Sequence, residues 1–359
     1  MFLKRLALLL AAACLLAAAQ AAQAAPVADP TARPALMIAE PAKTFLTAVA
    51  RAGKRLVAVG ERGIVVLSDD GGTSWRQAKV PVSVTLAAVQ FPTPSQGWAV
   101  GHYGVVLHSA DGGETWTRQL EGVQAAQLVL KDARAGQAGP AQLAEAERLV
   151  ADGPDKPLLN LYFSDARNGV VVGAYNLAFQ TRDGGKTWTP LSARLDNPKA
   201  NHLYAVQAAG SDIWIAGEQG LLLRSTDGGA QFARVDMPYK GSFFAMARAG
   251  GGLVLAGLGG NAFHSGDKGM HWQKLAVPAP VSITAISARG GAFLMANQAG
   301  MLLAGAPGSG AVVPLHLPPL PPLNDVLAQP DGSIVVVGMT GALRLPAPAG
   351  ATPVSMAAQ

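Results

Sequence analysis

The chain has 359 residues, half of them hydrophobic and 14% charged, with a formal net charge of +5 at pH 7. This apolar content is enough for a large core and excludes a largely disordered chain. The Lys and Arg residues are scattered singly rather than clustered in basic runs with aromatic residues between them, which argues against a nucleic-acid partner.

Residues 1–25 are typical of a secretory signal peptide. Lys4 and Arg5 precede the apolar run Leu6–Ala19, and Ala22 and Ala24 provide the small residues that a signal peptidase recognises. The run is shorter than the ~20 residues that a membrane-spanning helix needs, although an uncleaved anchor is the alternative. The sequence therefore predicts export to the periplasm.

A strand-like segment, Ala35–Ala39, comes first after the signal and precedes a unit of three more such runs. The runs Leu46–Val49, Leu56–Val59 and Ile64–Leu67 are too short and too rich in β-branched residues for helices. The turn Gly60–Gly63 joins the last two. We predict a hairpin with two ordinary residues in a type I turn and then a left-handed glycine, so that only the last glycine is required.

This hairpin turn recurs seven times, with Asn replacing glycine at one end in two copies. Asn is the next-best residue for positive φ, so the two replacements are compatible with the same turn. The turns are bounded by Gly60/Gly63, Gly101/Gly104, Gly173/Asn176, Gly217/Gly220, Gly257/Gly260, Asn297/Gly300 and Gly338/Gly341.

In five units an octet follows the hairpin, with a hydroxyl residue first, Asp third, Gly fifth and an aromatic residue last. The intervals between its aspartates are 41, 72, 44 and 40 residues, a period of about 40 with an insertion in the second gap. The octet residues are Ser68, Asp70, Gly72, Trp75; Ser109, Asp111, Gly113, Trp116; Thr181, Asp183, Gly185, Trp188; Ser225, Asp227, Gly229; and Ser265, Asp267, Trp272.

Four strands in each of seven units predict an all-β fold, a seven-bladed β-propeller of four-stranded antiparallel blades over residues 35–345. The last unit lacks an octet and a fourth strand, so we expect Ala35–Ala39 to supply the outer strand of the seventh blade and close the ring. Residues 346–359 are expected to be a flexible tail. The expected blades span residues 45–80, 86–120, 158–195, 202–236, 242–277, 282–315 and 322–345.

Residues 121–157 are an insertion between the second and third blades. They are rich in Ala, Gln, Glu and Leu, and Leu143, Ala146, Glu147 and Val150 recur at helical spacing. The segment is predicted to be helical, either covering its own blade or contacting a partner.

The octet is the Asp-box, or BNR repeat, and five copies favour a structural role over five active sites. A carboxylate that accepts N–H bonds within its own turn locks a hairpin, and the Trp packs between blades. Asp111 lacks the further oxygen ligands of an EF-hand calcium loop, and no His pair or nucleophile motif has catalytic spacing. We therefore expect no cofactor, no metal and no catalytic residue.

With the run Gly97–Gly104 (GWAVGHYG) leading into the box Ser109–Trp116, the chain resembles the photosystem II stability/assembly factor family. The resemblance covers about residues 35–345. It implies a non-catalytic scaffold that binds an integral membrane protein during assembly, in the thylakoid lumen if the organism is photosynthetic. The client in other bacteria could be an RND-type transporter. The alternative is a sialidase-like glycoside hydrolase acting on periplasmic glycans.

Topology assigns the insertion to one face of the propeller. In a four-stranded blade, the hairpins between the second and third strands share a face with the connections between blades, and the Asp-boxes lie on the other face. Exposed aromatic and Arg side chains at such tips favour protein contacts, and the alternative is that they are solvated turn residues. The protein is expected to be a monomer. The candidate partner-binding residues are Arg62, His102, Tyr103, Tyr175, Glu218 and Met339.

Overall fold

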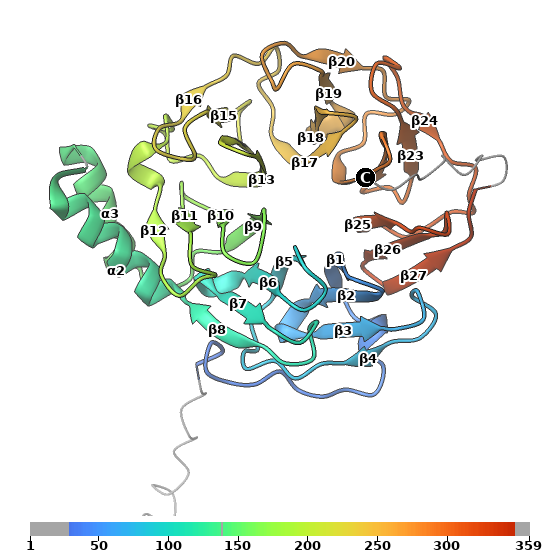
Figure 1. Ribbon diagram of the computed structural model, residues 1–359, viewed down its shortest axis with the longest axis horizontal. Helices are drawn as coiled ribbons and strands as arrows, with labels where there is room; N and C mark the ends of the chain where they lie inside the picture. Colours follow the sequence, from blue (N-terminus) through green and yellow to red (C-terminus); the bar gives the residue numbers. More distant parts are fainter. Residues whose placement is uncertain (1–28, 138, 349–359) are drawn as a thin grey trace, which may run out of the picture.

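The computed structural model describes residues 29–137 and 139–348, so the predicted signal peptide 1–25 and residues 349–359 of the predicted tail lie outside the described residues. Seven antiparallel sheets stand radially around a central channel, which confirms the predicted seven-bladed β-propeller (Figure 1). Six sheets have four strands and the seventh has three.

In every blade the strands follow one another outward from the channel. The first three blades consist of β1 (Leu46–Ala52), β2 (Arg55–Gly60), β3 (Val65–Ser68) and β4 (Arg76–Gln77); β5 (Leu86–Gln90), β6 (Gly97–Gly101), β7 (Val106–Ser109) and β8 (Thr117–Leu120); and β9 (Leu158–Phe163), β10 (Gly169–Gly173), β11 (Ala178–Thr181) and β12 (Thr189–Pro190).

The remaining four blades repeat this order. They consist of β13 (Leu203–Ala209), β14 (Asp212–Gly217), β15 (Leu222–Ser225) and β16 (Ala233–Arg234); β17 (Phe243–Ala249), β18 (Gly252–Gly257), β19 (Ala262–Ser265) and β20 (Gln273–Leu275); β21 (Ile283–Arg289), β22 (Ala292–Asn297), β23 (Leu302–Gly305) and β24 (Val313–Pro314); and β25 (Leu323–Ala328), β26 (Ile334–Gly338) and β27 (Gly341–Leu345).

The core lies between neighbouring blades. Val57 and Leu67 of the first blade pack with Ala99 and Leu107 of the second, and the box residue Trp116 joins the same cluster. The second strands are buried on both faces, which explains why their sequences are almost wholly apolar rather than alternating. Blade-on-blade packing therefore stabilises the ring, since no one sheet could bury both faces alone.

The prediction that Ala35–Ala39 is the fourth strand of the seventh blade is wrong. These residues form no strand and lie along the outer edge of the first blade, where Ala35 N–H donates to Val80 O at 3.0 Å. The side chain of Gln77 takes two main-chain groups of the segment, accepting from Ile38 N–H and donating to Leu36 O. The main-chain groups of the segment are thus bonded to the first blade, which leaves β27 as the outer strand of the seventh.

Apolar packing between the two blades and side-chain bonds between their inner strands close the ring instead. Asn324 Nδ2 of β25 donates to Leu46 O of β1 at 2.8 Å, and Val49 N–H donates to Asp325 Oδ2 at 2.9 Å. Farther along the same seam, the guanidinium of Arg51 donates to Gln329. The first and seventh blades are therefore held together without an exchanged strand.

The hairpin turns differ in detail from the predicted type I turn. In five of the seven turns the second middle residue is itself left-handed, as at Arg62 with φ of +53°, and the final Gly63 is left-handed too, at +74°. In the first hairpin Gly60 is also required, because a Cβ there would lie 2.2 Å from Phe45 O, whereas the sixth hairpin has Asn297 at this position. Each hairpin thus packs tightly on the connection that precedes its blade, as in the bond from Glu61 N–H to Phe45 O.

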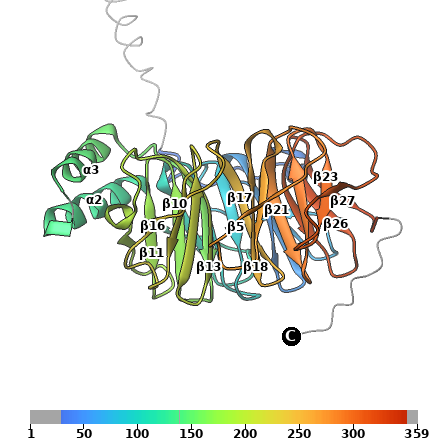
Figure 2. The ribbon, with the colours of Figure 1, turned by 90° about the horizontal axis from the view of Figure 1, so that it is seen from above.

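The predicted helical insertion is confirmed between the second and third blades. It comprises α2 (Gly122–Asp132), the short turn η4 (Ala133–Gln137) and α3 (Pro140–Asp152). The Glu121 side chain begins α2 by accepting N–H bonds from Val123 and Gln124, both at 2.9 Å. The two helices project from the rim of the ring (Figures 1 and 2).

Candidate protein-binding face

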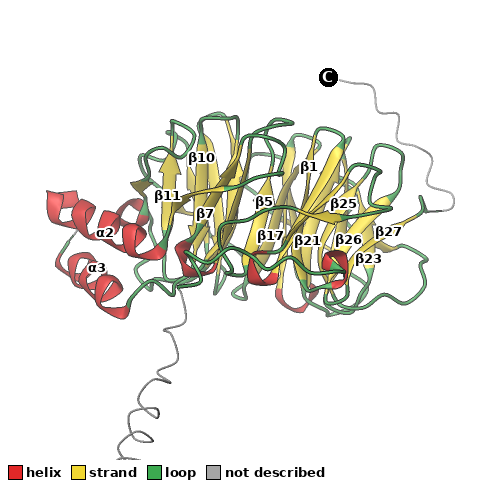
Figure 3. Cartoon of the chain, turned by 90° about the horizontal axis from the view of Figure 1, so that it is seen from below, coloured by secondary structure: helices red, strands yellow, loops and turns green. Residues whose placement is uncertain are grey.

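One face of the propeller carries the seven hairpins and the connections between blades, and is called here the hairpin face. The opposite Asp-box face carries the boxes and the loops between first and second strands. The short 3₁₀ turns at the hairpins lie along one side of the molecule, and the insertion lies at its edge (Figure 3). Contacts of α2 with the hairpin η3 (His102–Gly104) place the insertion on the hairpin face.

Four hairpin tips hold non-glycine residues in the left-handed region. Arg62, Tyr103, Tyr175 and Gln219 have φ between +53° and +59°. Such a conformation costs of the order of 1–3 kcal/mol for a residue with a Cβ and persists only where the surroundings enforce it. The backbone of these residues is therefore held in a fixed conformation.

The structure brings only some of the predicted partner-binding residues together. Tyr175 and Glu218, on adjacent blades, both contact His202. Arg62 on the first blade and Met339 on the seventh are exposed and lie apart from that pair. On the second blade His102 is exposed, but Tyr103 packs partly into the core and is less available than the sequence suggests.

His202 is the centre of a cluster that the sequence did not single out. Its Nδ1 accepts the backbone N–H of Tyr175 at 3.2 Å, and its own backbone N–H donates to Glu218 Oε2 at 2.8 Å. The hydroxyl of Tyr204 donates to Glu218 Oε1 at 3.2 Å, and burial together with this carboxylate raises the pKa of Tyr204 to about 12. The hydroxyl therefore stays a hydrogen-bond donor at physiological pH.

An aromatic row leads from Tyr175 toward the channel. Its ring centroids are 4.6 Å apart for Tyr175 and His202, 6.2 Å for His202 and Tyr204, and 5.4 Å for Tyr204 and Phe244. His202 immediately precedes β13 and Tyr204 is its second residue, and this spacing of two was the available sequence signal.

Tyr204 and Phe244 reach the channel because every inner strand is bulged at the same place. In each blade the register of the inner strand skips one residue, and the skipped side chain lines a channel cavity of about 590 Å³. The seven skipped residues are Thr47, Ala87, Leu159, Tyr204, Phe244, Thr284 and Asn324.

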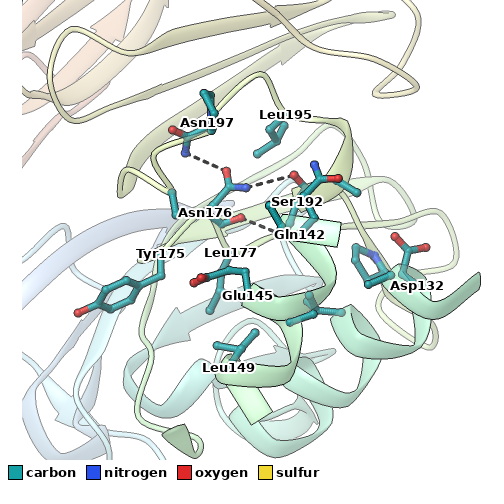
Figure 4. Close-up of a pocket in the computed structure, with 18 of the residues that line it drawn as sticks. Asp132, Gln142, Glu145, Leu149, Tyr175, Asn176, Leu177, Ser192, Leu195 and Asn197 are labelled. Atoms are coloured by element: carbon teal, nitrogen blue, oxygen red, sulfur yellow. Dashed lines mark hydrogen bonds between the residues drawn. The ribbon is translucent and has the colours of Figure 1, made fainter. Parts of the chain in front are cut away.

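A cleft of about 620 Å³ lies between the insertion and the third blade (Figure 4). Its apolar wall includes Leu149 of α3 and Leu177 and Leu195 of the third blade. Tyr175 stands at one end, so the cleft and the aromatic row meet at this side chain. The sequence predicted Tyr175 but not the cleft.

The cleft exists because the connection that follows the third blade stands away from its hairpin. Elsewhere the last hairpin residue is glycine in close contact, as at Gly220, where a Cβ would lie 2.3 Å from Tyr239 O. The third blade has Asn176 there, whose Nδ2 donates to Ser192 O at 3.1 Å and whose Oδ1 accepts from Asn197 Nδ2 at 2.9 Å (Figure 4). The amide bridges the wider gap and holds it open.

The five Asp-boxes share one hydrogen-bond pattern on the other face. In the second box, Ser109 Oγ donates to Asp111 Oδ1 and accepts Gly113 N–H, both at 2.8 Å, while Asp111 also accepts Thr115 N–H at 3.0 Å. In the third box, the backbone N–H and the hydroxyl of Thr187 both donate to the Asp183 carboxylate. These bonds lower the pKa of Asp183 to about 2. Each box thus fastens the turn between the third and fourth strands.

Within the described ranges 29–137 and 139–348, no group of three or more His, Cys, Asp or Glu side chains is arranged to hold a metal ion. In the same ranges, no helix is long and apolar enough to cross a membrane.

Comparison with known proteins identifies relatives by sequence and by fold. A curated relative, "Photosystem II assembly lipoprotein Ycf48" of Synechococcus sp. (strain CC9902), is 38% identical over 71 residues. That match spans 20% of this chain and 21% of the relative, about a fifth of its length.

Two solved structures illustrate the likeness in fold. "YCF48 bound to D1 peptide" has a TM-score of 0.62 at 16% identity, with 87% of this chain and 98% of that chain covered. The GH74 enzyme of Niastella koreensis has a TM-score of 0.56 at 14% identity, with 86% and 44% covered. At such identities these two structures are evidence for the propeller fold alone.

The family match covers most of the propeller. Residues 38–124 and 149–287 match the model described as "Photosynthesis system II assembly factor YCF48". The gap between these ranges, residues 125–148, falls within the helical insertion. Since the matched ranges make up more than half of the chain, the protein belongs to the photosystem II assembly factor YCF48 family.

Proposed function

We propose that the protein is a non-catalytic scaffold that binds a membrane-protein client through its hairpin face and assists the client's assembly or stability. The observation that carries this proposal is the presence of exposed large apolar side chains on the hairpins. Tyr175, Leu258 and Met339 are each about half exposed, at 46%, 48% and 58%. Exposed apolar and aromatic groups on rigid tips favour protein contacts.

The lining of the channel supports a non-enzymatic role. Glycoside hydrolases use two carboxylates about 5–10 Å apart at the reacting bond. Among the described residues that line the channel cavity, Asp325 is the only carboxylate, and both of its oxygens accept backbone N–H groups. The described channel lining thus lacks the pair of carboxylates that a glycosidase uses. A propeller glycosidase remains the alternative function to test.

The location and client follow from the predicted signal peptide and from the family. We propose that the protein is exported to the periplasm, or to the thylakoid lumen in a photosynthetic organism, and acts there as a monomer. The solved relative "YCF48 bound to D1 peptide" is a family precedent for a protein ligand. The proposed client here is an integral membrane protein, a photosystem subunit or an RND-type transporter according to the organism.

Affinity purification from detergent-solubilised membranes tests the proposal. The tagged protein should retain one membrane protein in stoichiometric amounts, and the triple variant Tyr175→Ala/Leu258→Ala/Met339→Ala should lose it. Met270→Ala/Val313→Ala is the matched control, because these side chains are equally exposed but lie off the hairpins. Equal retention by both variants would contradict the proposed face.

A glycosidase screen of the same preparation addresses the alternative. We expect no turnover of periplasmic glycans. Turnover that is abolished by Asp325→Asn would establish an enzyme and overturn the scaffold proposal.

A further inference from the structure

We propose that the cleft beside the insertion and the aromatic row form one continuous groove for a peptide segment of the client, with Lys or Arg among apolar side chains. This inference rests on the proposed scaffold function and names the chemistry of the segment that is bound. The groove is defined by the cleft between α3 and the third blade and by Tyr175, His202, Tyr204 and Phe244.

The charges around the cleft favour a cationic ligand. Asp132, Glu145 and Asp196 line it, and no Lys or Arg is among its described lining residues. Glu145 is paired with Arg148, but among the described residues no cationic side chain lies within 4 Å of the Asp132 or Asp196 carboxylate. The chain carries a net positive charge, so two such carboxylates at an apolar cleft create a local region of negative potential. This region attracts Lys or Arg.

The charge pattern continues along the aromatic row. Glu218 lies beside His202 and Tyr204 and remains partly exposed. Lys156 lies 5.4 Å from the Tyr175 ring centroid and is paired with Asp155 and Asp152, and Arg248 lines the channel at the other end of the row. The row therefore presents aromatic faces and a carboxylate, which suit apolar and cationic side chains.

The length of the groove favours a peptide over a small molecule. The three steps of the aromatic row, 4.6, 6.2 and 5.4 Å, together match about five residues of extended chain. The cleft at its end has the volume of a pocket for several side chains. A compact ligand would fill the cleft and leave the row unused.

The groove is also held in shape before any ligand binds. Asn176 is bonded to Ser192 and Asn197 on one wall, and Leu143, Ala146 and Val150 pack α3 onto α2 on the other. A rigid groove loses little conformational entropy on binding, which favours affinity for a short segment.

Selection from a random dodecapeptide library displayed on phage tests the proposal with the mature protein as target. The selected peptides should be enriched in Lys or Arg beside Leu, Val or aromatic residues. Synthetic versions should bind at least ten-fold more tightly than versions with Glu in place of Lys or Arg, measured by fluorescence anisotropy. Selection of acidic or uncharged peptides, or of none, would overturn the proposal.

Charge reversal locates the site of binding. Asp132→Lys/Asp196→Lys should weaken the selected peptide at least ten-fold, and Tyr175→Ala/Phe244→Ala should weaken it by a similar factor. The control Glu147→Lys/Asp236→Lys makes the same charge change at exposed carboxylates outside the groove and should alter binding less than two-fold. Equal losses in the charge-reversal variant and its control would show general electrostatic attraction and overturn the assignment.

Two further measurements decide between occupants. If dodecylguanidinium displaced the peptide at equal affinity and the aromatic substitutions had no effect, the occupant would be a small cationic amphiphile. If sedimentation showed a dimer that the cleft substitutions dissociate, the occupant would be a second copy. Either result would overturn the peptide assignment.

The client purification separates this inference from the proposed function. Should Asp132→Lys/Asp196→Lys still retain the membrane client, the scaffold stands and the groove assignment fails. Should the unmodified protein retain no client, the scaffold proposal fails whatever the peptides show.

Discussion

Carboxylates in this molecule are perturbed in opposite directions by their surroundings. In the Asp-boxes, hydroxyl and N–H donors stabilise the anion and lower the pKa, to about 2 for Asp183. Asp325 is half-buried at the seam between the seventh and first blades, and desolvation raises its pKa to about 6. The repeat made the box aspartates visible in the sequence. The sequence carries one sign of Asp325. Five other blades have alanine at the equivalent position after the bulge of the inner strand, as at Ala48 and Ala88.

Asp325 should give the fold a pH dependence opposite to ordinary acid denaturation. Its pKa is raised from 3.8, so the folded state holds the proton more tightly than the unfolded state. The free energy of unfolding should therefore fall by about 2 kcal/mol as pH rises from 4 to 7, with most of the change made by pH 6. Asp325→Asn should lack this change in urea titrations at pH 4, 5, 6 and 7.

The exposed Asp236→Asn is the control for this titration and should parallel the unmodified protein at every pH. If Asp325→Asn also paralleled it, the carboxylate would be solvated in the folded state.

Asp111→Ala should cost about 1–3 kcal/mol of stability, because Ser109 Oγ–H and the N–H and hydroxyl of Thr115 lose their acceptor. Urea denaturation of the variant measures this loss. The folded variant should bind the client as well as the unmodified protein does, because the box lies on the Asp-box face. Loss of client binding at unchanged stability would show that the box is a binding site.

At the scale of elements, the insertion was predictable and the cleft was not. Helical spacing of Leu143, Ala146 and Val150 in the sequence identified the face that packs on α2. The cleft depends on bonds from Asn176 to Ser192 and Asn197, which lie 16 and 21 residues away along the chain. In the sequence this Asn was only a tolerated replacement for glycine, so the turn pattern carried no signal for the cleft.

Excision of the insertion should leave the ring folded. Gly122 and Pro154 are in contact, since a Cβ on Gly122 would lie 2.3 Å from Pro154 O, so a Gly-Ser linker can replace residues 123–153. The loss of Ala125, Leu128 and Leu149 from the core between blades should cost about 2–4 kcal/mol. Thermal unfolding should remain cooperative, and affinity for the client should fall at least ten-fold. Full client binding by the excised protein would exclude the insertion from the interface.

At the scale of the whole molecule, counting the hairpins was enough to predict seven blades, but the closure of the ring was mispredicted. The hairpin pattern is local, whereas closure rests on bonds between residues 278 apart, such as Asn324 to Leu46. A shortage of strands at one end and a spare run at the other suggested an exchanged strand. The side chain of Gln77 binds that run to the first blade instead.

Among the described residues, the seam between the seventh and first blades has an apolar cluster of its own but is the one seam that no chain connection crosses. Asn324→Ala removes the bond to Leu46 O at this seam, whereas Gln207→Ala removes the comparable bond to Met246 O between the fourth and fifth blades. Each loss should cost about 1 kcal/mol locally. The fourth and fifth blades are also joined by continuous chain, so opening there stays limited.

Hydrogen exchange measured by mass spectrometry distinguishes the two seams. In Asn324→Ala, peptides from β25–β27 and β1 should exchange about five-fold faster than in the unmodified protein. No connection of the described chain joins these two blades, so nothing covalent opposes local opening at this seam. In Gln207→Ala, peptides from β13 and β17 should change less than two-fold. Equal acceleration in both variants would mean that the ring opens as one unit, and that its closure does not depend on these side chains.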